Sequence, residues 1–259
     1  DSVLNQSYQN FELIITDDFS TDQSYSICKE YSKGNEKVRL LKNKRKGKNS
    51  AFNMAYKEST GELICYFAGD DIMTPKSLYD RTRYIPEKTN SSSSCVSRVK
   101  MISAINKFNN IELPKNKKKG TLLGGCVMFD RLLGDKIFPI PEELPNEDKW
   151  TALHMTYFSK VFHVPHISLL YRIHFKNSSS RTKNFKTKNI DMHSRFKVYR
   201  LFLNTYKLNL DANVISFLDS MSNAEKLRYD SKTFSLLFSP IPFNEKIRFI
   251  FHSNRFLYW

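Results

Sequence analysis

The sequence lacks the patterns that would make it a membrane-spanning, secreted or zinc-binding protein. No apolar stretch approaches the roughly eighteen residues of a membrane-spanning helix, and no signal-peptide pattern opens the chain. The four cysteines, Cys28, Cys65, Cys95 and Cys126, do not have the spacing of a zinc site. Because Cys65 lies inside an apolar run, we expect reduced thiols in a cytoplasmic protein.

Internal repeats and the common nucleic-acid-binding signatures are also missing. No helix-turn-helix, zinc-finger or RNA-recognition pattern is evident, so a basic nucleic-acid-binding protein is the less favoured interpretation. The charge still has to be explained, since 41 Lys and Arg against 26 Asp and Glu give a formal net charge of +15. Such a charge favours anionic partners, whether nucleotide phosphates, nucleic acid or an anionic membrane face.

The sequence does contain three acidic clusters at wide spacing. Asp17-Asp18 closes the apolar run 11–16, Gly69-Asp70-Asp71 follows the apolar run 62–67, and Glu147-Asp148 opens a later segment. In open α/β sheets ligands bind at the carboxyl ends of strands, so we expect the first two pairs to face one crevice. The alternative interpretation is that these acids cap helices or form turns.

Strand and helix patterns alternate along the first part of the chain, which holds enough apolar residues for a sizeable core. Strands are predicted at 11–17, 37–42, 62–68, 122–129 and 161–171. Helices are predicted at 20–32 with a Ser20 and Gln23 capping box, at 49–59, 75–84 and 147–158, and at the helix end 3–8. The polar residues 91–94 and 106–119 are predicted loops.

This alternation indicates an α/β fold with a mostly parallel sheet flanked by helices. From residue 184 the pattern becomes helical and basic, so we predict a domain boundary near residue 180. The expected domains are therefore 1–180, which carries the acidic clusters, and the helical C-terminal extension 181–259.

Five motifs then give a specific resemblance. They are Ser2-Val3-Leu4-Asn5-Gln6-Ser7-Tyr8, Asp17-Asp18-Phe19-Ser20-Thr21-Asp22, Asn53-Met54-Ala55 before Thr60-Gly61-Glu62, Gly69-Asp70-Asp71, and Asn146-Glu147-Asp148-Lys149-Trp150. In this order and rough spacing the chain resembles the family 2 inverting glycosyltransferases of GT-A fold, of the bacterial polysaccharide or lipopolysaccharide type. The resemblance implies sugar transfer from a nucleotide diphosphate, expected to be a UDP-sugar, to a glycan or lipid-linked glycan.

The resemblance also implies which residues bind the donor. Asp71 would bind Mn²⁺ or Mg²⁺, with His174 of the Arg-x-His-x-x-Asn-Ser element as a further ligand, and Asp18 would accept a hydrogen bond from the base. The other residues expected to bind the donor are Asp17, Lys48, Asn53, Asp70 and Arg172. For the run 42–48, solvated surface charge is the alternative interpretation.

The third acidic cluster would carry the catalytic step. Asp148 matches the family's general base, which takes the proton of the acceptor hydroxyl, and Glu147 stands beside it. Helix-terminus electrostatics is the alternative for both acids. Gly124, Gly125 and Trp150 are expected on the acceptor side, although a strand bulge and a core position are the alternatives for the glycines and the tryptophan.

Two features concern the ends of the chain. Residues 181–259 hold 14 Lys and Arg against 6 Asp and Glu, and Phe243, Ile247, Ile250 and Phe251 form an apolar stripe that suits either packing on the catalytic domain or peripheral contact with the anionic inner face of the cytoplasmic membrane. Family members begin with a strand and a Pro-x-Tyr-Asn turn upstream of the segment at Ser2, whereas this sequence starts at Asp1. We therefore expect a GT-A-like domain without its first strand, and a catalytically inactive scaffold is the alternative function.

Overall fold

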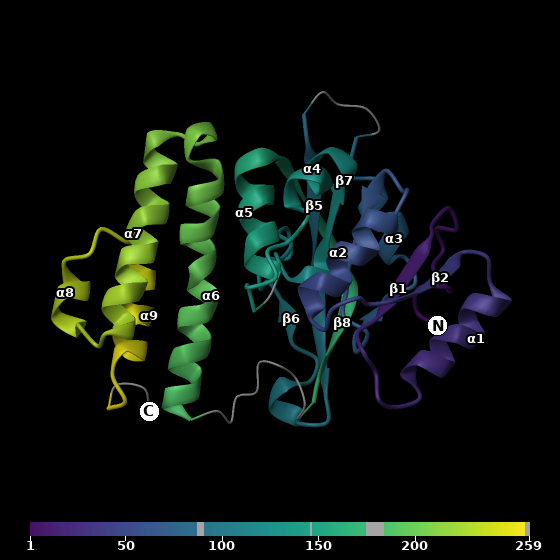
Figure 1. The fold of residues 1–259 in the computed structure, drawn as a ribbon, viewed down its shortest axis with the longest axis horizontal. Helices are drawn as coiled ribbons and strands as arrows, with labels where there is room; N and C mark the ends of the chain where they lie inside the picture. Colours follow the sequence, from purple (N-terminus) through teal and green to yellow (C-terminus); the bar gives the residue numbers. More distant parts are fainter. Residues whose placement is uncertain (87–90, 146, 175–183, 257–259) are drawn as a thin grey trace. The chain divides into compact units, whose positions relative to one another are not determined.

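The computed structural model describes residues 1–86, 91–145, 147–174 and 184–256 (Figure 1). The chain forms two compact units, the first of Asp1–Glu142 and Trp150–Asn177 and the second of Glu143–Lys149 and Ser178–Trp259. The boundary predicted near residue 180 falls within residues 175–183, which lie outside the described part of the chain. Each unit is described by itself.

The first unit opens with a parallel strand pair. Strand β1 (Leu13–Asp17) pairs with β2 (Val38–Lys42), and helix α1 (Ser24–Gly34) connects them. Helix α2 (Lys48–Glu58) follows and packs against β1. The β-branched and aliphatic residues of β1 favour an extended strand that packs against a neighbouring helix. The strand–helix–strand pattern predicted for this region is therefore confirmed.

A mixed sheet of six strands forms the centre of the first unit, and the α/β fold class is confirmed. The strand order is β3-β7-β5-β8-β4, with β6 paired to β5. The long ladder between β5 and β8 is parallel, whereas the shorter pairings of this sheet are antiparallel. The strands are β3 (Leu63–Ile64), β4 (Ile72–Met73), β5 (Ser93–Ser103), β6 (Glu112–Leu113), β7 (Val127–Asp130) and β8 (Lys160–Ile173).

Helices and short 3₁₀ turns connect the strands of this sheet. They are α3 (Ser77–Thr82), η1 (Asn106–Phe108), η2 (Gly124–Cys126), α4 (Arg131–Ile137) and α5 (Asp148–Phe158). The predicted strand at 161–171 and the predicted helix at 147–158 are confirmed. Pro165 falls within β8 at a register shift, where the missing backbone N–H breaks no regular ladder bond.

The central strand β5 corrects the prediction that residues 91–94 form a loop. Ser93 and Ser94 begin the strand and are buried. Their polarity suggested solvent exposure, but a serine is small and tolerates burial when its hydroxyl is hydrogen-bonded. Ser94 Oγ lies 2.7 Å from Ser159 Oγ, and Ser97 Oγ donates to Cys126 O at 3.0 Å.

All four cysteines are free thiols.

Other local predictions are also corrected. Residues 2–5 form turns instead of a helix end, and α1 begins at Ser24, so the capping box predicted from Ser20 to Gln23 does not form. The strand predicted at 62–68 is reduced to two residues, which pair with β7. Cys65 and Phe67 still pack against buried residues of the core, whereas Glu62 is exposed.

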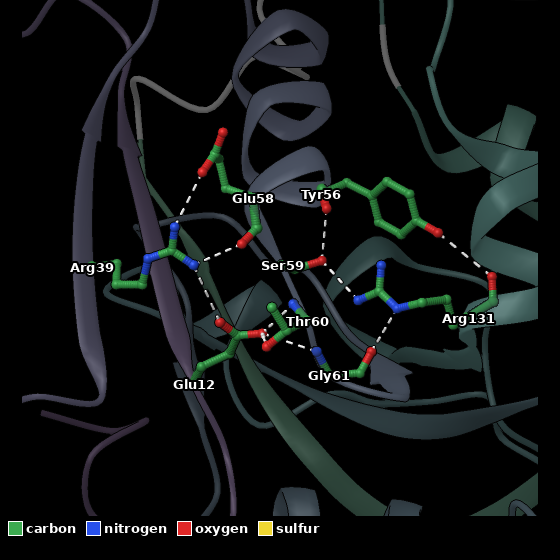
Figure 2. A network of polar contacts seen from close by, with 8 residues as sticks. All are labelled: Glu12, Arg39, Tyr56, Glu58, Ser59, Thr60, Gly61 and Arg131. Atoms are coloured by element: carbon green, nitrogen blue, oxygen red, sulfur yellow. Dashed lines mark hydrogen bonds and ion pairs between the residues drawn. The ribbon is translucent and has the colours of Figure 1, made fainter.

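The junction between α2 and β3 is fastened by a polar network (Figure 2). Glu12, just before β1, accepts hydrogen bonds from both backbone N–H groups of residues 60–61, at 2.6 and 2.9 Å. Arg39 of β2 lies 3.6 Å from the Glu12 carboxylate and 3.1 Å from that of Glu58. Arg131 of α4 donates to the carbonyl of residue 61 at 2.8 Å. The network therefore ties β1, β2, α2 and α4 together.

The second unit is helical, as predicted for the C-terminal region. It contains α6 (Phe185–Tyr206), η3 (Lys207–Asn209), α7 (Ala212–Tyr229), α8 (Thr233–Leu237) and α9 (Phe243–Ser253). Asn184 caps α6, because its side chain accepts a hydrogen bond from Thr187 N at 2.9 Å. Phe202, Leu218 and Phe249 lie in its core. Among the described residues, no helix combines the length and apolar content needed to cross a bilayer.

Candidate active site

Two segments that are distant in sequence meet beside β4 and β8. These strands are antiparallel, and extending their register by two residues before β4 sets Asp70 opposite Arg172. Arg172 N donates to Asp71 Oδ1 at 3.1 Å, and its guanidinium Nε donates to Asp70 O. His174 Nε2 lies 3.0 Å from Asp70 Oδ2. The structure therefore brings four of the predicted donor-site residues into one cluster.

The surroundings of Asp71 shift the pKa of its carboxylate. Burial raises the pKa of Asp71 from 3.8 to about 6. The hydrogen bond from Arg172 N opposes this rise, the charge of Asp70 adds to it, and the cations Arg172 and Lys48 oppose it. Two carboxylates in adjacent positions repel one another, so the site favours a bound positive charge.

The acidic pair after β1 holds a tight turn. Asp18 Oδ1 accepts hydrogen bonds from Gly47 N and from Asn43 Nδ2, both at 2.8 Å. Gly47 has a φ of 148°, a left-handed conformation that side-chain-bearing residues rarely adopt. Lys48 follows directly and begins α2, and its charge is close enough to Asp71 to lower that residue's pKa. The turn held by Asp18 and the Asp71 cluster are thus neighbours through Lys48.

Asn43 is a residue of this site that the sequence analysis missed. It is buried, its amide nitrogen donates to Asp18, and its side-chain oxygen accepts from Ser50 Oγ at 3.2 Å. Its position directly after a strand could have identified Asn43 as a site residue, because polar residues at strand ends lie at the sheet edge where ligands bind. The charge of residues 42–48 favoured solvated surface for most of this run, and Lys48 alone was expected to bind the donor.

The cluster contains side-chain oxygen and nitrogen atoms of the kind that bind a divalent cation, whose remaining ligands a bound substrate would supply. Among the described residues, no three His, Cys, Asp or Glu side chains form a ready-made metal cage. Mg²⁺ is usually held by one or two carboxylates together with substrate phosphates and waters, so a preformed cage is not required. The Asp71 and Asp70 carboxylates, with His174 beside Asp70, supply ligands of this kind, and a metal site at this cluster stays a prediction.

The proposed base lies in the second unit. Asp148 is the first residue of α5 and is half-buried, whereas Glu147 is only 3% exposed. Of the two acids, Asp148 therefore has the more accessible carboxylate. Negative charge in the first turn of a helix is stabilised by the helix macrodipole.

Two predicted site residues have structural contacts instead. Asn53 Nδ2 donates to Ile140 O at 2.8 Å and its Oδ1 accepts from Ile140 N at 2.6 Å, so both ends of its amide bridge α2 to another segment. Trp150 is 3% exposed, and its Nε1 donates to Ile137 O at 2.8 Å. Trp150 therefore has no face left for a sugar, and we correct the expectation of sugar contact by this residue. Asn53 is partly exposed, and donor binding by Asn53 stays a prediction.

The remaining predicted residues divide as follows. Gly125 is buried in η2, and a Cβ there would lie 2.6 Å from a side-chain atom of Leu169, so its small size serves packing. Gly124 in the same turn is partly exposed. Asp17 accepts a bond from Ser20 N at 3.3 Å, a turn contact. Asn146 and the Asn177-Ser178 end of the Arg-x-His-x-x-Asn-Ser element lie outside the described residues.

The first half of the chain matches a known protein family. Residues 1–134 match the family described as glycosyl transferase family 2. The putative glycosyltransferase EpsE of Bacillus subtilis (strain 168) is 34% identical over 87 residues, which are 33% of this chain and 31% of EpsE. The poly(ribitol-phosphate) beta-N-acetylglucosaminyltransferase TarS of Staphylococcus aureus (strain Mu50 / ATCC 700699) is 35% identical over 78 residues, 30% of this chain and 14% of TarS.

The fold has a counterpart among solved structures. The crystal structure of S. aureus TarS 1-349 has a TM-score of 0.61 and 17% sequence identity, and the similarity covers 99% of this chain and 76% of that one. At this identity the similarity shows the fold alone, which is the expected GT-A-like α/β architecture. The matched parts of the curated relatives span about a third of EpsE and a smaller share of TarS.

Proposed function

This chain belongs to glycosyl transferase family 2, and on that premise we propose that it transfers a sugar, with inversion, from a nucleotide diphosphate to a glycan or lipid-linked glycan. The donor is a UDP-sugar. One observation supports this proposal above the others: Lys48 links the Asp18 turn to the cluster of Asp70, Asp71, Arg172 and His174. A nucleotide diphosphate needs both a polar pocket for its base and a cationic environment for its phosphates.

The donor is bound by residues from both sides of Lys48. Asp18 accepts a hydrogen bond from the base, and the contacts of Asn43 and Gly47 hold its carboxylate in place. Lys48 and Arg172 face the diphosphate as cations. Mn²⁺ or Mg²⁺, held by Asp71 with Asp70 and His174, would neutralise charge on the departing diphosphate.

Asp148 acts as the general base. Inversion needs the acceptor hydroxyl to attack the anomeric carbon from the face opposite the leaving group. As the new glycosidic bond forms, Asp148 takes the hydroxyl proton, and the bond from the anomeric carbon to the diphosphate oxygen breaks. The assignment rests on the resemblance of residues 146–150 to the family motif and on the accessible carboxylate of Asp148.

The acceptor is proposed to be an anionic surface glycan or its lipid-linked precursor. A formal net charge of +15 attracts anionic polymers. The name of the relative TarS specifies poly(ribitol-phosphate), a phosphate-bearing polymer, as the molecule on which that protein acts. We propose that the protein works in the cytoplasm, in polysaccharide or lipopolysaccharide synthesis, where such precursors are available at the membrane face.

Ligand-induced thermal stabilisation tests the proposal. We expect UDP with Mn²⁺, at about ten times its Kd, to raise the free energy of unfolding by roughly 1.4 kcal/mol and Tm by roughly 3–5 °C. Asp71→Ala should remove the metal-dependent part of this shift. Asp148→Asn should keep the shift but lose UDP release from a panel of UDP-sugars with acceptor present. Glu36→Ala, which changes an exposed carboxylate, is the matched control and should behave as the unaltered protein.

Two outcomes would replace the proposal. If millimolar UDP gives no shift with Mn²⁺ or Mg²⁺, the chain is a glycosyltransferase-like scaffold without turnover. If the protein instead binds random RNA with an affinity that falls steeply with salt and survives Asp71→Ala, the nucleic-acid interpretation replaces it.

A further inference from the structure

The second unit exposes a dense group of large apolar side chains on α8, α9 and the residue after α8. We call it the α8–α9 apolar surface, and it consists of Phe234, Leu237, Phe238, Phe243, Ile247 and Phe251. Phe234 and Phe238 touch edge to face with centroids 5.2 Å apart, and α8 packs against α9. Four exposed phenylalanines within 18 residues of sequence are unusual for a surface that faces only water.

Helix α9 has one face that packs against the rest of the second unit and another that is exposed. Phe249 is fully buried and meets the ring of Phe196 on α6 edge to face, with centroids 5.1 Å apart. Phe243, Ile247 and Phe251, spaced four residues apart, are 76%, 40% and 54% exposed. Side chains at this spacing share one helix face. Three of the four stripe residues identified in the sequence therefore lie off the face that packs against the core of this unit, whereas the fourth, Ile250, is half-buried.

Charge and shape indicate the kind of partner. Residues 232–256 contain four Lys and Arg against a single Glu. Arg248 is exposed and lies one position after Ile247, beside the stripe, and Arg255 is also exposed. Apolar side chains flanked by arginines match the boundary between anionic lipid headgroups and acyl chains.

We propose that the α8–α9 apolar surface binds an anionic lipid bilayer. The phenylalanines and Ile247 enter the boundary between headgroups and acyl chains, and Arg248 and Arg255 contact lipid phosphates. This inference rests on the proposed function in one respect, because membrane binding would place the enzyme beside a lipid-linked acceptor. Binding of the protein to the bilayer requires neither the sugar donor nor turnover. A bilayer fits better than a folded protein partner because the exposed stripe lies on a single helix whose cations flank its apolar side chains.

Flotation with vesicles tests this proposal on the whole chain. We expect the protein to float with phosphatidylcholine vesicles that contain about one third phosphatidylglycerol, and to stay at the bottom with phosphatidylcholine alone. The double variant Phe243→Gln/Phe251→Gln should reduce the vesicle-bound fraction at least tenfold with an unchanged Tm. Leu208→Gln, which changes an almost fully exposed leucine of η3 in the same unit, is the matched control and should float normally.

The charge contribution has its own variant. Arg248→Gln/Arg255→Gln should shift binding to a higher phosphatidylglycerol content and weaken its dependence on salt. Asp71→Ala should float as the unaltered protein does, so a failure of the donor site is distinguished from a failure of membrane binding. The proposal is overturned if the protein does not float with anionic vesicles, or if the double phenylalanine variant floats equally well. It is also overturned if this variant abolishes a dimer in solution while leaving flotation unchanged, because a second copy then covers the surface.

Discussion

Among single residues, Asp71 is a candidate site residue whose ionised carboxylate lowers the free energy of unfolding at neutral pH. Its folded-state pKa of about 6 lies above its ordinary value of 3.8, so its carboxylate is destabilised at neutral pH. The folded protein binds this proton more tightly than the unfolded chain does. Asp71 therefore contributes stability at pH below about 4 that is lost as the pH rises through about 6.

We expect Asp71→Asn to stabilise the ligand-free protein at pH 7. Asp71 remains partly exposed, which screens the effect, so the gain should be about 1 kcal/mol, or roughly 2–4 °C in Tm. The gain should disappear as the pH is lowered from 7 to 4, because the unaltered protein then carries a protonated Asp71. Melting curves of both proteins across this range test the prediction, and a Tm difference independent of pH contradicts it.

Asn43 and Asn53 show what residue identity leaves open. Both are asparagines close to predicted site residues. The side chain of Asn43 donates a hydrogen bond to Asp18, whereas the amide of Asn53 forms hydrogen bonds with the backbone N–H and C=O of Ile140. An amide serves equally well for either purpose. Only the neighbour that the fold supplies decides between them.

Among the elements, the α2–β3 junction depends on one carboxylate before β1. Partial burial alone would raise the pKa of Glu12, but hydrogen bonds from the backbone of Thr60 and Gly61, together with the charge of Arg39, outweigh it and hold the pKa below 4.5. This contribution is present above the pKa of the unfolded chain and is lost as the pH falls through the lower folded-state pKa.

Glu12→Gln should therefore destabilise the protein at pH 7 by about 1 kcal/mol. The difference from the unaltered protein should shrink as the pH falls below about 4, where the Glu12 carboxylate is protonated as well. Urea titrations at pH 7 and at pH 3.5 measure it. Glu36→Gln, an exposed carboxylate on the same unit, is the control and should change the free energy of unfolding little at either pH.

Strand β5 shows which kind of secondary-structure element the sequence could not predict. Apolar residues identified β1, β2 and β8 in the sequence, because these strands carry the residues that a buried strand prefers. Strand β5 begins with serines, and the hydroxyls of Ser94 and Ser97 bond to the Ser159 hydroxyl after α5 and to the Cys126 carbonyl in η2. No local pattern distinguishes such serines from those of a loop.

For the whole molecule, the second unit has a polar core of its own. Arg228 is fully buried and donates to both Glu225 oxygens, at 2.7 and 2.6 Å, and to His252 O at 2.9 Å. A cavity of about 380 Å³ lies beside this pair, lined by α6 and α7 residues such as His193 and Tyr229 and by none of the predicted site residues. The ion pair lies within α7, and the hydrogen bond from Arg228 to His252 O joins α7 to α9.

Arg228→Ala should unfold the second unit selectively. Loss of the guanidinium leaves Glu225 buried without its cation, which costs roughly 3–5 kcal/mol. We expect hydrogen exchange to lose protection in α6, α7 and α9 while β5 and β8 stay protected. Arg200→Ala removes an exposed pair with Asp219 in the same unit and should cost less than about 1 kcal/mol. Equal loss of protection in both units would show that they unfold together.

The sequence by itself determined the family, the α/β class, most helices and strands, and which acidic residues are candidates for the site, because these follow from the order of residues and from periodicity within a few positions. The tertiary structure decided the rest. It set Asp70 against Arg172 through the register of β4 and β8, tied the Asn53 amide to Ile140, buried Trp150, and left Phe243, Ile247 and Phe251 of α9 exposed. Each of these outcomes depends on a partner far away in the sequence, and strand pairing and burial are settled only when such partners meet.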